Sequence, residues 1–367
     1  MTKESTTHTD AQPLGGGDAS VPDAARPTLA IGAAMPLNPV FLAPLSGITD
    51  VPFRRIARRL GAGLVVSEMV ASGEFVKGLR ESALRAMHDG EGLHVVQLAG
   101  RNPVWMKAAA ERLVDLGADI IDINMGCPAR KVVGGQSGSA LMREPDLALS
   151  LVEATVEGAG AIPVTLKMRL GWDHETINSP ELAVRAESAG VKMITVHGRT
   201  RMQFYEGSAD WSAISAVKAA VSVPVVANGD LVELDQQAAM LSASGADAVM
   251  IGRGACGRPW LPGLMAGAVG CRELESIGFA DLVVEHYEAM LEHYGAYTGV
   301  RHARKHLGWY LDRFALATGE TLAADRAAIM ATAEPPVAIG LIRQLFGTAS
   351  IAAVEFDSPA TCRREAA

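Results

Sequence analysis

Several features that would point to other classes of protein are scarce or absent in this sequence. Aromatic residues make up only 5% of its 367 residues, so aliphatic side chains must dominate the core. No apolar run approaches the roughly 20 residues of a membrane span, and the N-terminal residues lack the apolar core of a signal peptide. The net charge of −8 argues against a general polyanion binder, although a local basic patch is compatible with it.

Cysteine is also scarce. The four cysteines, Cys127, Cys256, Cys271 and Cys362, are widely separated and form no C-x-x-C pair. This argues against a metal cluster and against a disulfide framework. We therefore expect a protein without a metal site, in a reducing, cytoplasmic setting.

Short apolar segments recur along the chain, with segments of helical periodicity between them. Near-continuous apolar strands separated by helices are typical of a parallel sheet covered on its outer face. Eight such units predict an α/β fold, a (β/α)8 TIM barrel; a doubly wound sheet is the structural alternative. The expected strands are FLAPLSG (41–47), LVVSEMV (64–70), HVVQLAG (94–100), IIDINMGCP (120–128), PVTLKMRLG (163–171), MITVHGRT (193–200), PVVANGD (224–230) and AVMIGRGA (248–255).

The two ends of the chain do not share this pattern. Residues 1–35 are rich in Thr, Gly, Asp, Ala and Pro, which predicts a disordered tail before a barrel over 36–270. Residues 275–350 contain amphipathic helical patterns, at 280–297, 301–318 and 335–347, so we expect a C-terminal all-α helical domain there. The residues from 356 onward are expected to fray.

The expected strands begin with apolar residues and end with polar residues or glycine. In a (β/α)8 barrel the carboxyl ends of the strands form the mouth at which the chemistry takes place. The sequence therefore predicts a functional site from these strand ends: Ser46, Gly47, Glu68, Gln97, Asn124, Lys167, Arg169, His197, Arg199, Asn228, Gly229, Asp230, Gly252 and Arg253.

The last two strand ends, ANGD (227–230) and IGRGA (251–255), are rich in glycine. Loops at these two places in a barrel commonly bind phosphate, and backbone N–H groups with Arg253 could hold a phosphate monoester. The alternative is that the glycines only turn the chain. GRGACG (252–257) also fits the dinucleotide-binding pattern G-x-G-x-x-G, but a Rossmann turn follows the first strand of its domain.

Three polar side chains, Gln97, Lys167 and His197, are predicted to surround one cavity. A lysine at the end of a buried strand is costly unless it meets an anion or an acceptor. Lys167 together with Arg169 therefore indicates an anionic or electron-rich ring inside the mouth. Taken singly, His197 could equally be a structural histidine and Gln97 a capped strand end.

Cys127 follows the fourth strand in a turn that contains Asn124, Gly126 and Pro128 and precedes Lys131. A free cysteine is more often an inert core residue, but reactive cysteines need exposure and polar neighbours, and this turn offers both. If the thiol donates a proton rather than attacks, it should be mostly protonated at neutral pH, which an ordinary pKa of about 8.5 allows.

The motifs taken together resemble a known family. APLSGITDVPFR, SEMV, VQLAG, DINMGCPARKV, GSALM, VTLKMRLGW, TVHGRTR, VVANGD and MIGRGACGRPW are similar, in order over roughly residues 38–315, to the tRNA-dihydrouridine synthases. The bacterial B-type branch is the most similar. The resemblance implies that FMN binds at the barrel mouth, that NADPH reduces it, and that a hydride passes to C6 of a tRNA uridine while Cys127 protonates C5. Because that base is stacked within tRNA, it must be flipped out.

The resemblance also implies residue roles. The FMN contacts correspond to Pro44, Leu45, Ser46, Gly47, Gln97, Asn124, Lys167, His197, Asn228, Gly229, Asp230, Gly252 and Arg253. A positive charge near the pyrimidine edge of a flavin stabilises its anion, and Lys167 can supply it. Residues Leu45 and Ser46 depart from the family, where Met-Ala is frequent.

Two basic segments could bind the phosphates of tRNA. In RHARKHLGWYLDR (301–313), Arg301, Arg304 and Lys305 share a helical face, and we expect them, with Lys131, Arg169 and Arg199 at the mouth, to contact tRNA. FRRIARRL (53–60) is the second segment. For both, a solvated basic face is the alternative.

Two other functions remain open from the residues. One is an FMN barrel of the dihydroorotate dehydrogenase type, which acts on a small substrate. The other is a non-catalytic RNA-binding barrel. The basic C-terminal region argues against the first, and the set of Cys127, Lys167 and His197 argues against the second. We expect a monomer, and neither the uridine position nor a role for the tail can be inferred.

Overall fold

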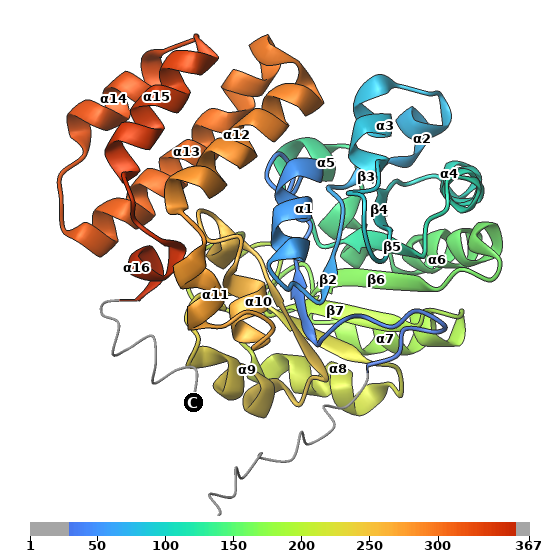
Figure 1. Cartoon of the computed structure of the whole chain (residues 1–367). Helices are drawn as coiled ribbons and strands as arrows, with labels where there is room; N and C mark the ends of the chain where they lie inside the picture. Colours follow the sequence, from blue (N-terminus) through green and yellow to red (C-terminus); the bar gives the residue numbers. More distant parts are fainter. Residues whose placement is uncertain (1–28, 357–367) are drawn as a thin grey trace, which may run out of the picture.

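The structure, a computed structural model, describes residues 29–356 (Figure 1). Its centre is a parallel sheet in the order β2-β1-β9-β8-β7-β6-β5-β4-β3. The strands are short and buried because they consist mainly of aliphatic and β-branched residues. They are β1 (Val40–Leu42), β2 (Leu64–Val65), β3 (Val70–Ala71), β4 (Val95–Ala99), β5 (Ile120–Met125), β6 (Val164–Arg169), β7 (Met193–His197), β8 (Val225–Asn228) and β9 (Ala248–Ile251).

The second of the eight predicted strands is broken in two, and its two halves close the ring. β2 pairs with β1, and β3 pairs with β4. Between the halves, the backbone N–H of Ser67 donates to the carbonyl of Val95 at 3.1 Å. The Ser67 hydroxyl accepts from the backbone N–H of Gln97 at 3.0 Å. The predicted (β/α)8 barrel is therefore confirmed, with nine strand pieces in place of eight strands.

Helices cover the outside of the barrel. α1 begins at Asp50, whose carboxylate accepts from the backbone N–H of Phe53 at 3.1 Å, and α4 begins at Asn102, which accepts from Val104 at 2.9 Å; both are N-caps. The helices of this part are α1 (Val51–Arg59), α2 (Ser72–Val76), α3 (Arg80–Ala86), α4 (Pro103–Asp115), α5 (Arg130–Gly134), α6 (Pro145–Ala159), α7 (Ser179–Ser188), α8 (Ser215–Ala220), α9 (Gln236–Ser244) and α10 (Leu261–Met265), with 3₁₀ turns η1 (Gly138–Arg143), η2 (Ser212–Ile214) and η3 (Arg253–Ala255).

The end of the predicted N-terminal tail packs against the barrel. Ile31 and Ala34 are buried and exchange two backbone hydrogen bonds. They belong to one apolar cluster with Phe41, Val95 and Ile120, close to the amino ends of the strands. The rest of the predicted tail, residues 1–28, lies outside the described residues, as do the predicted frayed residues 357–367.

The C-terminal part is helical, as predicted. Figure 1 shows its longer helices gathered on one side of the barrel near α1. The sequence pattern missed α14. Cys271, in α11, is disulfide-bonded, a bond that the argument against a disulfide framework did not anticipate, whereas Cys127 and Cys256 are free. The helices are α11 (Cys271–Ser276), α12 (Phe279–Tyr294), α13 (Ala296–Thr318), α14 (Ala323–Ala331), α15 (Pro335–Phe346) and α16 (Ile351–Glu355).

A second apolar core joins these helices to the barrel. Phe279 contacts the rings of Trp260, Tyr310 and Phe346, and Ile56 of α1 belongs to the same cluster. Because Trp260 directly follows the last barrel unit, the two parts share buried surface rather than only a linker.

The predicted second basic segment, residues 53–60, is part of this packing rather than a free cationic face. Arg54 is buried and donates to the carbonyls of Thr49 and Met87. Arg58 pairs with Asp89 at 2.7 Å, and Arg59 with Glu285. Arg54 and Arg58 are therefore used inside the protein, whereas Arg55 and Arg59 are exposed, and RNA binding by this segment stays a prediction.

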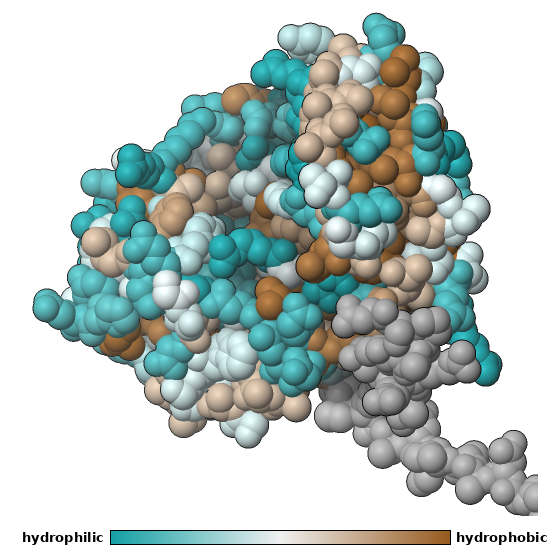
Figure 2. All heavy atoms as spheres, turned by 90° about the vertical axis from the view of Figure 1, so that its left-hand side faces the viewer, coloured by the Kyte–Doolittle hydropathy of each residue, from teal (hydrophilic) through white to brown (hydrophobic). Residues whose placement is uncertain are grey.

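Residues 29–356 contain no helix long and apolar enough to cross a membrane. In the same residues, no group of three or more His, Cys, Asp or Glu side chains could hold a metal ion. Figure 2 shows one face of the molecule, on which hydrophilic side chains surround a hollow between two lobes.

Candidate active site

A cavity of about 580 Å³ lies at the carboxyl ends of the strands, within the size range of small-molecule and cofactor sites. It is lined from nearly every loop of the barrel mouth, as the ring topology requires. The predicted site residues that line it are Pro44, Leu45, Ser46, Gln97, Asn124, Cys127, Lys167, Arg169, His197, Asn228, Gly229, Asp230, Gly252 and Arg253.

Neighbouring strands bring these polar side chains together in register. Asn124 on β5 is the partner of Lys167 on β6. Arg169, two residues further along β6, is the partner of His197 on β7, which in turn is the partner of Asn228 on β8. A parallel ring therefore converts the recurring polar strand ends into one continuous polar wall.

Beneath the cavity lies a chain of buried hydrogen bonds that sequence reasoning did not single out. The carboxylate of Asp122 accepts from the Gln97 amide at 2.7 Å and from the Thr165 hydroxyl at 2.6 Å. The carbonyl oxygen of the Gln97 side chain then accepts from the Asn124 amide at 2.7 Å. Asp122 thus fixes the orientation of Gln97, and Gln97 that of Asn124. The sequence contained one signal for this chain, a carboxylate inside the apolar strand IIDIN. Such a carboxylate must have hydrogen-bond partners, because burying it unpaired would be too costly.

Lys167 extends from β6 into the cavity wall. Its ammonium donates to the Asn228 side-chain oxygen at 2.8 Å, and the Asn228 amide donates to the Met250 carbonyl at 2.8 Å. Burial lowers the pKa of Lys167 to about 8, although nearby Asp122 acts in the opposite direction. The ammonium is therefore a strong partner for an electron-rich group, because its neighbours in the protein compensate its burial only in part.

Cys127 lies in a turn that is fixed on both sides. Its backbone N–H donates to the side-chain oxygen of Asn124 at 3.0 Å, and its carbonyl accepts from the Ser139 hydroxyl at 2.9 Å. Gly138 has a φ of +61°, and a Cβ there would come within 2.8 Å of the Cys127 carbonyl. Burial raises the pKa of the thiol, which the cations Arg169 and Lys167 only partly offset. Cys127 is thus held at the cavity as a protonated thiol.

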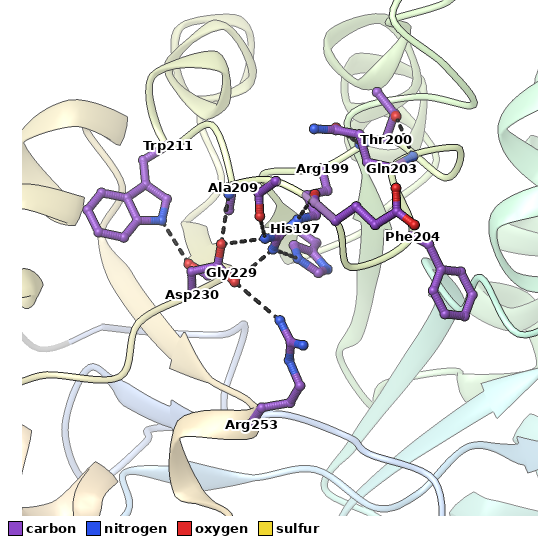
Figure 3. A network of polar contacts seen from close by, with 12 residues as sticks. His197, Arg199, Thr200, Gln203, Phe204, Ala209, Trp211, Gly229, Asp230 and Arg253 are labelled. Atoms are coloured by element: carbon purple, nitrogen blue, oxygen red, sulfur yellow. Dashed lines mark hydrogen bonds and ion pairs between the residues drawn. The ribbon is translucent and has the colours of Figure 1, made fainter.

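Asp230, His197 and two arginines form a network beside the two glycine-rich loops (Figure 3). Asp230 accepts from both terminal nitrogens of Arg199, at 2.8 and 2.5 Å, and from the backbone of Ala209 at 2.8 Å. Arg199 also donates to the Nε2 of His197 at 3.4 Å. Burial and the surrounding cations hold the pKa of His197 well below its ordinary value, so its ring is neutral.

Arg253 differs from Arg199 in exposure. Its side chain is 54% exposed and its contact with Asp230 is 3.3 Å, so it is free to turn toward a ligand. Gly229, next to Asp230, has a φ of +125°, and a Cβ there would come within 2.9 Å of the His197 ring. Together with Gly252 on the cavity wall, these features suit a bound phosphate.

Two of the arginines predicted to contact tRNA are buried. Arg169 donates to the carbonyls of Gly126, Thr200 and Phe204 at 2.9, 2.7 and 2.9 Å, and Arg199 is held by Asp230 and the carbonyl of Gly207. Their donors are thus largely used in fixing mouth loops, although Arg169 still borders the cavity. For Arg199 the structure supports a positioning role in place of a phosphate contact.

The remaining predicted residues do not line the cavity. Gly47 donates its backbone N–H to Glu68 at 2.5 Å, and a Cβ at Gly47 would lie 3.1 Å from the ammonium of Lys305. Lys305 of α13 therefore reaches the first barrel loop. Lys131 and Arg301 are exposed, and Arg304 is half-buried.

Sequence reasoning also missed two aromatic residues at the rim. Phe204 and Tyr205 line the cavity, and their rings meet edge to face at 4.8 Å. The guanidinium of Arg253 lies 4.7 Å from the Tyr205 ring. Their position in a loop, after the motif TVHGRTR, gave no periodicity that could have identified them.

The fold and the cavity define a barrel protein with a ligand site at the carboxyl end of its strands. Among solved structures, a histamine dehydrogenase from Rhizobium sp. 4-9 has a similar fold, with a TM-score of 0.52 and 15% identity over 72% of this chain. An amine oxidase acting on 6-hydroxypseudooxynicotine from Pseudomonas geniculata N1 gives a TM-score of 0.50 at 14% identity over 71% of this chain. This chain spans about half the length of each, 50% and 52%.

Sequence comparison is more specific than the fold. A family model described as dihydrouridine synthase matches residues 41–334. A probable tRNA-dihydrouridine synthase of Rhizobium leguminosarum is 58% identical over 81% of this chain and 92% of its own length. One of Rhodobacter capsulatus is 55% identical over 84% and 94%. A tRNA-dihydrouridine synthase B of Xanthomonas axonopodis is 46% identical over 84% and 92%. The chain belongs to the dihydrouridine synthase family, and the family resemblance of its motifs is confirmed.

Proposed function

We propose that this protein is a flavin-dependent tRNA-dihydrouridine synthase that works in the cytoplasm, as a monomer and without a metal. The barrel, residues 36–270, would be the catalytic unit and residues 275–350 the tRNA-binding unit. The single observation that carries the proposal is the position of Cys127, a protonated thiol on the same cavity wall as Lys167 and His197. The high identity to proteins named tRNA-dihydrouridine synthase supports the choice of substrate.

The residues of the cavity fit FMN. Gly229, Gly252 and the half-exposed Arg253 would hold the phosphate. Lys167 would face the electron-rich edge of the ring, because within residues 29–356 its buried ammonium has a single hydrogen-bond partner, the Asn228 side-chain oxygen. Pro44, Leu45 and Ser46 of the first loop, with Gln97 and Asn124, would complete the ring contacts. Bound in this way, FMN would supply the two-electron chemistry that links NADPH oxidation to the reduction of uridine at C6.

The side chains of the protein would supply the proton that accompanies the hydride. Reduction of a pyrimidine double bond needs one proton for each hydride, and Cys127 would give that proton to C5. The raised pKa of the thiol favours this role, because a thiolate has no proton to donate. Lys167 would add positive charge, and the neutral His197 would add hydrogen bonding, at the same cavity. The uridine must leave its stack to enter the cavity, and Phe204 and Tyr205 line the entrance.

The test is NADPH oxidation by the purified, flavin-loaded protein with alternative acceptors. We expect NADPH oxidation that depends on unmodified tRNA and is accompanied by the formation of dihydrouridine in the RNA. Oxidation or reduction that depends instead on orotate or dihydroorotate would identify a small-molecule dehydrogenase. A protein that binds tRNA but no flavin would be a binding module.

A further inference from the structure

Two arginines stack against the ring of Trp172 at the barrel mouth. The guanidinium carbon of Arg143 lies 3.9 Å from the ring centroid, and that of Arg201 lies 4.9 Å from it. Arg143 ends η1, after β5; Trp172 follows β6; Arg201 follows β7. Backbone bonds join the last two loops, from Arg201 to Gly171 at 3.0 Å and from Met202 to Trp172 at 2.8 Å. Three successive loops thus converge on one aromatic ring.

Neither guanidinium has an acidic partner. Among residues 29–356, no carboxylate forms an ion pair with Arg143 or Arg201, and the buried Nε of Arg201 has no hydrogen-bond partner. The nearest acidic residue in sequence, Glu144, is taken by Arg101 through two bonds of 2.8 Å. Arg143 acts on Glu144 electrostatically without a direct ion pair, and two cations held near one ring still repel each other. An anion between them would relieve this repulsion.

The cluster is continuous with the cavity rim. Met202, Phe204 and Tyr205 are 56%, 40% and 40% exposed, and the last two line the cavity. Arg169 holds this loop from beneath, through the carbonyls of Thr200 and Phe204. Apolar and aromatic surface therefore runs from the arginines into the site.

The cluster also lies across the mouth from the helical part. In the ring of strands, β6 and β7 are opposite the strands β1, β2 and β3. Lys305 of α13 reaches the loop after β1. A strand of RNA held at both places would cross the open end of the barrel, with the cavity between its two contacts.

We propose that Arg143, Trp172 and Arg201 form a binding site for the RNA backbone next to the reacting nucleotide. The inference rests on the proposed function, since it adds a contact for the same substrate. Guanidinium groups stacked on an aromatic ring keep their N–H edges outward, in the planar arrangement that suits phosphate. The exposed Met202 and Phe204 offer surface on which an unstacked base can pack.

The test is tRNA binding by the full-length, flavin-loaded protein, with an unmodified tRNA transcript over a range of salt concentrations. The double variant Arg143→Ala with Arg201→Ala should bind about tenfold more weakly at moderate salt, with a slope of log K against log salt that is flatter by about 1 to 2. The matched control, Lys192→Ala with Arg272→Ala, removes the same charge. Lys192 precedes β7 at the other end of the barrel and Arg272 lies in α11, so affinity should stay within about twofold.

Equal affinity and slope in the two double variants would overturn the inference. Flavin content should be unchanged, because neither arginine lines the cavity; if the alanine variant loses flavin through misfolding, Arg143→Gln with Arg201→Gln takes its place. Wild-type protein that binds tRNA without forming dihydrouridine would overturn the proposed function while leaving the binding comparison intact. Wild-type protein that binds no tRNA would overturn both.

Discussion

Cys127 acquires its proposed role from its surroundings rather than from its residue type. Asn124 and Ser139 fix the backbone on either side of it, and burial raises its pKa. These features would make a poor nucleophile, since nucleophilic cysteines have lowered pKa values. They suit an acid that must stay protonated until the substrate arrives.

Replacing this thiol should separate the two halves of the reaction. Cys127→Ala should lower dihydrouridine formation by about 10²-fold or more, because general acid catalysis contributes factors of about 10² to 10⁴. Flavin content and NADPH oxidation should stay near wild type. Cys256→Ala, which removes the second free thiol within residues 29–356, is the control. Near-normal dihydrouridine formation by Cys127→Ala would refute the role.

Lys167 should make flavin binding depend on pH. Its pKa is lowered from 10.5 to about 8 in the free protein, so it loses its charge as pH rises through about 8, and FMN affinity should fall over that range. Because its pKa is lower in the folded protein than in the unfolded chain, Lys167 destabilises the folded state most below about pH 8. This destabilisation decreases as the pH rises from about 8 to 10.5. Flavin fluorescence titrations at several pH values measure the effect.

Lys167→Met should bind FMN more weakly and with less dependence on pH. Lys218→Met, which removes a surface lysine paired with Asp247, should behave as wild type. An affinity that is constant across this pH range in the wild type would contradict the assignment of Lys167.

At the residue scale, the sequence predicted which side chains gather but not what each does. The polar residues at strand ends were identified because a barrel brings all such ends to one mouth. Whether an arginine there meets solvent or a backbone carbonyl depends on the loop that follows, so Arg169 and Arg199 were both read as RNA contacts. Asp122 was missed because a single carboxylate inside an apolar run is a weak pattern.

Among the elements, α16 is tied to the cavity by one buried ion pair. Arg258 pairs with Glu355 of α16, donates to the carbonyl of Val232 at 2.7 Å, and is joined by the Trp260 indole, which donates to Glu355 at 2.9 Å. Val232 lines the cavity. The last described helix therefore supports the loop that follows Asp230.

Glu355→Gln should destabilise the protein by about 3–5 kcal/mol, because it removes the buried carboxylate that pairs with both Arg258 and Arg313 and leaves Arg258 with the more exposed Glu233, at 3.9 Å. Denaturant unfolding measures this. The control Glu285→Gln breaks the exposed pair with Arg59 and should cost no more than about 1 kcal/mol. Equal losses in the two variants would show that burial does not set the strength of the Arg258 pair.

α13 carries three of the basic residues proposed to meet tRNA, Arg301, Arg304 and Lys305. Arg304→Ala with Lys305→Ala should weaken tRNA binding and flatten its salt slope by about 1 to 2, since each phosphate contact releases about one counterion. Arg343→Ala, a surface arginine of α15 paired with Asp281, is the control. An unchanged slope in the double variant would remove α13 from the RNA interface.

At the scale of elements, periodicity predicted most of the fold. The eight apolar runs became strands because a parallel sheet buries both of its faces. The break in the second strand was not predictable, because Ser67 and Glu68 read as a strand end although the barrel continues beyond them. α14 was missed because it is short, at nine residues, and its alanine-rich sequence, AADRAAIMA, buries a single side chain, Ile329.

For the whole molecule, charge is distributed to suit one polyanion at one place. The chain is acidic overall, at −8, while among residues 29–356 Arg143 and Arg201 on one rim and Lys305 near the opposite one form no direct ion pair with a carboxylate. Net repulsion elsewhere would disfavour unspecific contact with nucleic acid, and the two cationic places would select an RNA that spans the mouth. The net charge alone did not reveal where the unpaired cations lie, because their position depends on which cations form ion pairs in the fold.

The most direct test of the central claim is a single turnover without oxygen. Protein whose flavin has been reduced is mixed with unmodified tRNA, and flavin absorbance and dihydrouridine content are followed together. If the protein is a flavin-dependent tRNA-dihydrouridine synthase, tRNA should reoxidise the flavin, and one dihydrouridine should appear for each flavin reoxidised. Flavin that stays reduced in the presence of tRNA, or that reoxidises without forming dihydrouridine, would contradict it.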